Sequence, residues 1–183
     1  MSGSLIKVDE VTVSSSTASI IIGGGSSGSS GLNYAMDSTY NVYVLHQINV
    51  KASSNAATYR MRFTAGGSPQ TSALYDRSQM LFRSDTLWNF NAIANQTATD
   101  LEIGVSNTTG GVHSTQYIFN ASNASGYTYY TNESMRNSYD SQNVRGMLGG
   151  GVYRGVQAID GVQLYFATGD ITSAKFVLYG LKK

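Results

Sequence analysis

Few residues in this chain could carry acid–base or metal chemistry. His46 and His113 are the only histidines, and no calcium-binding D-x-D-x-D-G loop or zinc-binding H-E-x-x-H motif accompanies them. His46 falls among the apolar residues of an expected strand, where a histidine is more often a satisfied core or interface residue than a metal ligand or a base. The chain has no cysteine, so disulfides and thiolate metal sites are impossible. We therefore expect no metal and no cofactor.

Paired carboxylates are the other chemistry that the sequence could offer, because glycoside hydrolases place two of them across a cleft. Glutamate is scarce, and Glu102 and Glu133 are the candidates once Glu10, near the beginning of the chain, is set aside. Both lie where an expected strand would show a polar side chain to water. There is also no G-x-S-x-G motif and no glycine loop leading into a helix. The sequence predicts a protein without catalytic residues, not an enzyme.

Tyrosines are the residues most suited to binding. Tyr127, Tyr129, Tyr130 and Tyr139 lie among Asn, Ser and Asp residues. A tyrosine ring can stack on the C–H face of a sugar while neighbouring polar groups hydrogen-bond to its hydroxyls. Tyrosine is equally enriched where protein subunits touch. We favour a subunit contact over a sugar site for any single tyrosine, and both interpretations remain open.

Composition limits the possible partners. The chain has 183 residues, 13% of them charged, and a net charge of +1, which gives no field to attract nucleic acid or an anionic membrane. No apolar run approaches the roughly 20 residues that cross a bilayer, and the first ten residues do not form a signal peptide. We expect no nucleic-acid or membrane partner.

The elements that must position these side chains are expected to be strands. The chain is rich in Gly (20) and Tyr (13), contains one Pro, and shows no convincing helical periodicity. Expected strands cover residues 5–13, 18–22, 40–50, 58–64, 75–83, 101–105, 115–120, 127–135, 144–154, 162–166 and 175–181. The sequence thus predicts an all-β fold, a single antiparallel β-sandwich of jelly-roll type with about ten strands, over residues 1–183. A Gly/Ser-rich loop is expected at 23–31, and a loop around Trp88 is expected to plug one end of the sandwich.

Alternation along the strands predicts their faces. In the strand 40–50, Val42 and Val44 are expected to face the core and Tyr43 and Leu45 to face outward. Near the end of the chain, Val177 and Tyr179 repeat the outward pattern. We therefore interpret Tyr43, Leu45, Val177 and Tyr179 as oligomer contacts, because exposed apolar faces usually mark a contact.

The C-terminal strand is expected to be central or next to central in its sheet. Phe176 and Leu178 are expected to be buried against Val162, Leu164 or Phe166, and Gly169 to supply the turn between the last two strands, because glycine adopts positive φ without a Cβ clash. Variable binding is expected from loops at one end of the sandwich, at 120–126 and 137–143.

Several of these strands resemble small β-sandwich virion proteins of tailed bacteriophages, marine ones in particular. The resemblance lies in Gly-Val-Gln-Leu-Tyr-Phe at 161–166, Gly-Asp-Ile at 169–171, Phe-Val-Leu-Tyr-Gly-Leu-Lys-Lys at 176–183, and the segments 3–8 and 36–43. It implies a non-enzymatic virion structural protein, made in the host cytoplasm and located in the virion. A tail-fibre or tail-appendage role in host attachment comes first and capsid decoration second. Its partners would be other copies of itself, commonly a trimer, other virion proteins and a host cell-surface glycan. A free-standing carbohydrate-binding lectin would fit many of the same residues.

Overall fold

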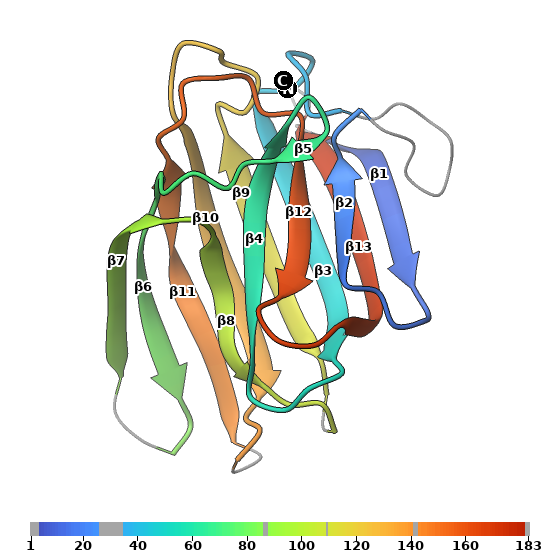
Figure 1. The fold of residues 1–183 in the computed structure, drawn as a ribbon, viewed down its shortest axis with the longest axis vertical. Coiled ribbons are helices and arrows are strands. Elements are labelled where there is room, and N and C mark those ends of the chain that lie inside the picture. The colour runs from blue at the N-terminus through green and yellow to red at the C-terminus, as the bar shows by residue number, and fades with distance from the viewer. Residues whose placement is uncertain (1–3, 26–34, 86–87, 109, 141–142, 182–183) are drawn as a thin grey trace.

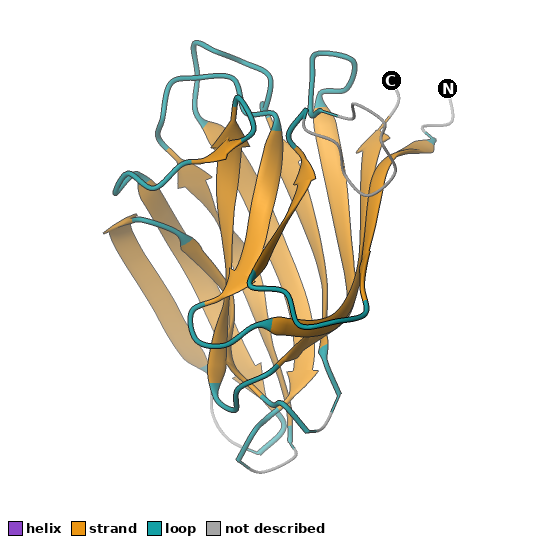
Figure 2. Ribbon diagram, turned by 45° about the vertical axis from the view of Figure 1, so that its right-hand side comes forward, coloured by secondary structure: helices purple, strands orange, loops and turns teal. Residues whose placement is uncertain are grey.

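The computed structural model describes residues 4–25, 35–85, 88–108, 110–140 and 143–181. Within this part of the chain the fold is all-β, with thirteen strands in two antiparallel sheets that face each other as in a β-sandwich (Figures 1 and 2). The expected all-β, antiparallel fold is confirmed. Strands β5 and β7 are the elements that sequence patterning did not find.

The larger sheet has eight strands. In spatial order they are β1 (Leu5–Val13), β13 (Ile171–Leu181), β3 (Val42–Ala52), β9 (Val112–Phe119), β10 (Thr128–Asn137), β11 (Val144–Tyr153), β6 (Tyr75–Arg83) and β7 (Asn89–Gln96). The smaller sheet contains β2 (Ser19–Gly23), β12 (Gly161–Phe166), β4 (Ala57–Ala65) and β5 (Ser68–Pro69), and β8 (Thr99–Val105) pairs with β4. In Figure 1 the smaller sheet lies in front of part of the larger one.

The apolar core lies between the sheets. As expected, Phe176 and Leu178 on β13 are fully buried in one cluster with Val162 and Leu164 on β12. Gly169 has a φ of 79° in the turn that separates these two strands, as its position predicted. Strand β13 is paired on both sides, with β1 and β3, but it is second from the edge of its sheet. The expectation of a central or next-to-central position was therefore wrong.

Strand β3 has its faces reversed relative to the prediction. Tyr43 and Leu45 belong to the core and are almost inaccessible to solvent. Val42 and Val44 face outward, although Val44 is only 2% exposed because neighbouring side chains cover it. The pairing register explains this, because Leu45 lies opposite the buried Leu178. A register irregularity near Asn49, whose φ is 54°, then changes the alternation so that Val50 also faces the core. The sequence pattern assumed unbroken alternation through this bulge and so placed Val42, Val44 and Val50 on one face.

Two expectations about loops also need correction. Trp88 does not plug the sandwich: it is 62% exposed and leads into β7, an edge strand of the larger sheet. The loops 120–126 and 137–143 lie at opposite ends of β10, not at one end. At about 3.4 Å per residue, the ten residues of β10 separate them by roughly 30 Å. The Gly/Ser-rich loop expected at 23–31 lies mostly outside the described residues.

Candidate functional site

A ladder of buried amides fixes the register of the central strands. Tyr59 on β4 donates its hydroxyl proton to Gln47 on β3, and the Gln47 amide donates to Gln116 on β9. Gln116 in turn donates to Asn132 Oδ1 on β10 at 2.6 Å, and Asn132 donates to the Leu101 carbonyl on β8 at 3.0 Å. All of these side chains are buried. Slipping a strand by one residue would move its amide to the outer face, so the ladder selects one register.

A buried ion pair continues this polar interior. Arg136 Nε on β10 donates to Glu102 Oε1 on β8 at 2.9 Å, and both side chains are at most 1% exposed. Ser134 donates to the other carboxylate oxygen of Glu102 at 2.7 Å, and Arg136 also donates to the Ile103 carbonyl. Burial raises the pKa of Glu102 above its ordinary value, although the charge of Arg136 opposes the shift. The pair joins the two sheets where the apolar core ends.

The outer face of the larger sheet carries a long row of side chains. Cross-strand pairing aligns one residue from each of seven neighbouring strands, in the order Val177, His46, Thr115, Glu133, Leu148, Met80 and Phe90. A parallel row contains Val42, Phe119, Tyr129 and Val152. Phe90 is 83% exposed and Tyr129 50%, and many of the other apolar members are partly exposed.

Charge is sparse on this outer face. From β3 to β7, the described outward-facing side chains include two carboxylates, Glu133 and Asp76, and a lysine, Lys51. Arg154 is 2.8 Å from Asp76 and compensates its charge. The exposed surface is therefore mostly aromatic and aliphatic, the composition found at the centre of protein contacts. Sequence reasoning missed most of it, because Met80, Leu148 and Phe90 are ordinary strand residues until pairing places them side by side.

The two histidines line the same depression on this surface. His46 and His113 line one shallow depression across β3, β9 and β10, together with Glu133 and Met135. His46 is held by a hydrogen bond between its Nδ1 and the Thr115 hydroxyl at 3.2 Å and by an edge-on contact with the ring of Tyr179. No group of three or more metal-ligating side chains is found among the described residues. Ile48 and Met135 are the apolar residues of its lining, and Glu133 is its one carboxylate.

The glutamates considered for hydrolysis do not share a cleft. Both were expected to face water, which was wrong for Glu102: it is fully buried between the sheets, whereas Glu133 faces outward from the opposite side of the larger sheet. Glu10 lies away from both, on β1, where Lys175 is 3.0 Å from its carboxylate. The hydrogen bond from Lys175 lowers the pKa of the Glu10 carboxyl. No pair of these side chains has the facing arrangement that glycoside hydrolysis needs.

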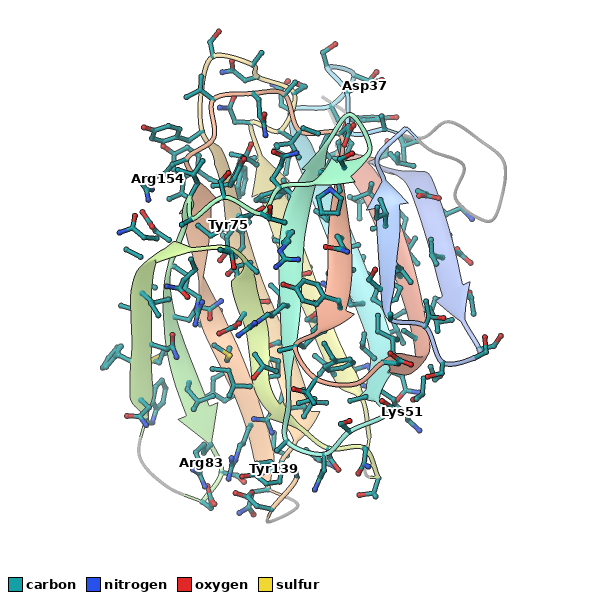
Figure 3. All side chains as sticks on the ribbon, in the orientation of Figure 1. Asp37, Lys51, Tyr75, Arg83, Tyr139 and Arg154 are labelled. Atoms are coloured by element: carbon teal, nitrogen blue, oxygen red, sulfur yellow. The ribbon has the colours of Figure 1, made fainter. Side chains whose placement is uncertain are left out.

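The tyrosines proposed for binding are dispersed. Tyr127 and Tyr129 are exposed near the 120–126 loop. Tyr139 is also exposed, and it lies at the other end of the sandwich, where Figure 3 labels it. Tyr130 points inward: it is 2% exposed and shares a hydrogen bond with Thr99 on β8. Burial raises the pKa of Tyr130 to about 12. Alternation along β10 explains the difference, because Tyr129 and Tyr130 are neighbours and must face opposite sides.

The four residues interpreted as oligomer contacts separate into two pairs. Tyr43 and Leu45 are core residues, and the Tyr43 hydroxyl donates to the Asp37 carbonyl at 2.8 Å. They are therefore closed to any partner in this fold. Val177 and Tyr179 do lie on the outer face, where Val177 is covered by its neighbours and Tyr179 is partly exposed.

Comparison of the chain with protein families, with curated proteins and with solved structures gave no match. Within the described residues there is no helix long and apolar enough to cross a membrane.

Proposed function

We propose that this chain is a non-enzymatic structural protein of a tailed-bacteriophage virion. In this proposal the sandwich is of jelly-roll type, and the protein belongs to a tail fibre or tail appendage that takes part in host attachment. Its neighbours are other copies of itself and other virion proteins. The observation that carries the proposal is the weakly charged, aromatic outer face of the eight-stranded sheet between β3 and β7.

Such a face favours an assembled protein over a free one. Apolar side chains scattered singly on a surface are ordinary, but here they align in rows across neighbouring strands. Covering apolar surface gains roughly 25 cal/mol per Å², so a partner that covers the rows is stabilised by them. The resemblance of the segments 161–166 and 176–183 to phage virion proteins supports a virion as the assembly.

Capsid decoration is the second role within a virion, since a decoration protein also rests one face on other subunits. A free-standing lectin is the alternative from another class. The observation favouring a lectin is the pairing of Tyr129 with Phe119, two exposed rings on adjacent strands that could stack on a sugar. Tyr127 is exposed two positions before Tyr129.

Immuno-electron microscopy of purified phage particles tests the virion proposal. Antibody label at the tail supports the proposed role, label on the capsid moves the protein to decoration, and particles without the protein refute both. Glycan-array binding by the isolated protein, lost in Tyr129→Ala, would instead favour the lectin.

Adsorption assays separate attachment from assembly. Tyr129→Ala and Tyr139→Ala change exposed rings at opposite ends of β10, so each serves as the control for the other. A host-binding tyrosine should reduce adsorption when replaced while particle assembly stays intact. Lost assembly would make that tyrosine a subunit contact, and unchanged adsorption in both variants would remove the glycan part of the proposal.

A further inference from the structure

We propose that the free edge of β7 pairs with β7 of a second copy of this chain. The two strands run antiparallel about a two-fold axis, so that the eight-stranded sheets of both copies become continuous. The inference depends on the edges of the sheets and not on the virion role, and it would hold equally for a lectin.

The other edges in the described structure, at β1, β2, β5 and β8, are protected against such pairing. On β8, the Leu101 and Ile103 carbonyls already accept hydrogen bonds from Asn132 and Arg136 of β10. Strand β1 carries Lys7, Asp9 and Glu10, and its register is broken by an irregularity between Lys7 and Asp9. The short strand β2 has its Gly23 amide donating to the Asp9 carboxylate at 2.9 Å. Strand β5 contains two residues, one of which is Pro69. Charge, bulges, short length and proline are the devices by which natural sheets prevent edge-to-edge association.

Strand β7 lacks most of these devices. It has eight residues, and the sequence from Trp88 to Thr99 contains neither a charged residue nor proline. Residues 89–93 pair regularly with β6, and the bulge of this hairpin comes later, near Asn95 with its φ of 57°. Phe90 and Ile93 are exposed on this strand, on opposite faces. A regular, uncharged and partly apolar edge is therefore open to another strand.

A second copy fits this edge by symmetry and by charge. A two-fold axis normal to the sheet sets an edge antiparallel to itself and keeps the same face outward on both copies. The absence of charge on β7 removes the like-charge repulsion that normally opposes self-pairing. An axis at Asn91 would place Phe90 of one copy beside Ala92 of the other, a large side chain next to a small one. The apolar row through Leu148, Met80 and Phe90 would then continue across both copies.

This symmetry predicts a dimer, in place of the trimer that the phage resemblance implies. Light scattering and sedimentation velocity on the full chain should give a dimer. Ala92→Lys should convert it to a monomer, because Ala92 is exposed on the free edge and lysine there adds like charges beside the axis. Thr12→Lys on the β1 edge is the matched control and should leave the dimer intact. A wild-type monomer or trimer, or equal effects of both lysines, would overturn the inference.

Engineered cysteines test the register without relying on a disruptive variant. The chain has no cysteine, so any disulfide comes from the introduced residue. Directly opposed residues of an antiparallel pair have Cβ atoms about 4.5–5.5 Å apart, close to the separation a disulfide needs. Asn91→Cys should form a covalent dimer under mild oxidation more readily than Asn89→Cys or Ile93→Cys, and Thr12→Cys should not. Failure of all three β7 variants to cross-link would contradict β7 pairing.

Discussion

The buried Arg136–Glu102 pair allows a demanding test of the structure. Replacing Arg136 with Met would leave the Glu102 carboxylate fully buried, with Ser134 as its remaining side-chain donor. Breaking a buried pair by removing one partner typically costs about 3–5 kcal/mol, against a total stability of about 5–15 kcal/mol for a domain. For a chain of 183 residues, about 2–4 °C is lost per kcal/mol. The melting temperature should therefore fall by about 6–20 °C.

The same variant should show a characteristic pH dependence. A carboxyl whose pKa is raised in the folded state contributes stability that is present below its unfolded value of 4.5 and lost as pH rises through the folded value. Without Arg136 the pKa of Glu102 should rise further. The stability deficit of Arg136→Met should therefore shrink as the pH is lowered from about 7 to about 5.

Chemical denaturation of the two single variants and the double variant completes the assay. Glu102→Leu combined with Arg136→Met removes both charges and should cost less than the sum of the single changes, by about 0.5–3 kcal/mol. Lys7→Met breaks the exposed contact between Lys7 and Glu10 and should leave the melting temperature unchanged. Additive single effects, or an Arg136→Met variant as stable as wild type at neutral pH, would refute the placement of this pair.

Three further outcomes are expected. Phe176→Ala should destabilise the protein by about 3–5 kcal/mol in denaturant titrations, because the side chain is fully buried between the sheets; an unchanged midpoint would contradict the position of β13. Tyr130 has a pKa raised to about 12, so the stability gained by burying its neutral phenol should be lost as pH rises from 10 towards 12. Tyr130→Phe should flatten that alkaline decline, and an identical decline in both proteins would count against it. Gly151→Ala should lower the melting temperature, because an added Cβ would be 2.3 Å from the Asp76 carbonyl oxygen and 2.5 Å from the Tyr130 hydroxyl; a fully stable variant would show that β6 and β10 lie farther from β11.

Local alternation predicted much of the fold, where strands are regular. The segment 58–64 shows this: Tyr59, Met61 and Phe63 are buried and alternate with the arginines, as their period of two predicts. The same logic failed on β3, because the bulge at Asn49 is a tertiary feature with no strong local signal. It also failed on β7, where Asn and Ala residues have low strand propensity and the pairing with β6 decides the structure.

The candidate site was less predictable than the fold. Single residues such as Tyr129 were recognised by type, but the outer face depends on which strands become neighbours. Strands β10, β11, β6 and β7 follow an order in the sheet that differs from their order in the chain. No spacing within the sequence indicates that Leu148, Met80 and Phe90 align in one row. Such a row follows from topology and register, and both require the folded structure.

One half of the eight-stranded sheet has an unusual distribution of polarity, which bears on both proposals. Beneath β9, β10 and β6 the interior contains Gln116, Asn132, Arg136 and Arg77, satisfied by one another or by β8, beside the core residues Ile118, Tyr130 and Tyr75 of the same strands, while the outer side carries aromatic and aliphatic side chains. A sheet with one face in water normally has the opposite arrangement.

The polar interior supplies register and rigidity through hydrogen bonds, but it buries less apolar surface than an ordinary core. Covering the outer face or pairing β7 would add apolar contact to this half of the sandwich. Assembly should therefore stabilise β6, β7 and β10 more than β13, which lies near the opposite edge of the sheet from β7. Hydrogen exchange compared between dilute and concentrated protein measures that difference, and uniform protection across the sheet would argue against it.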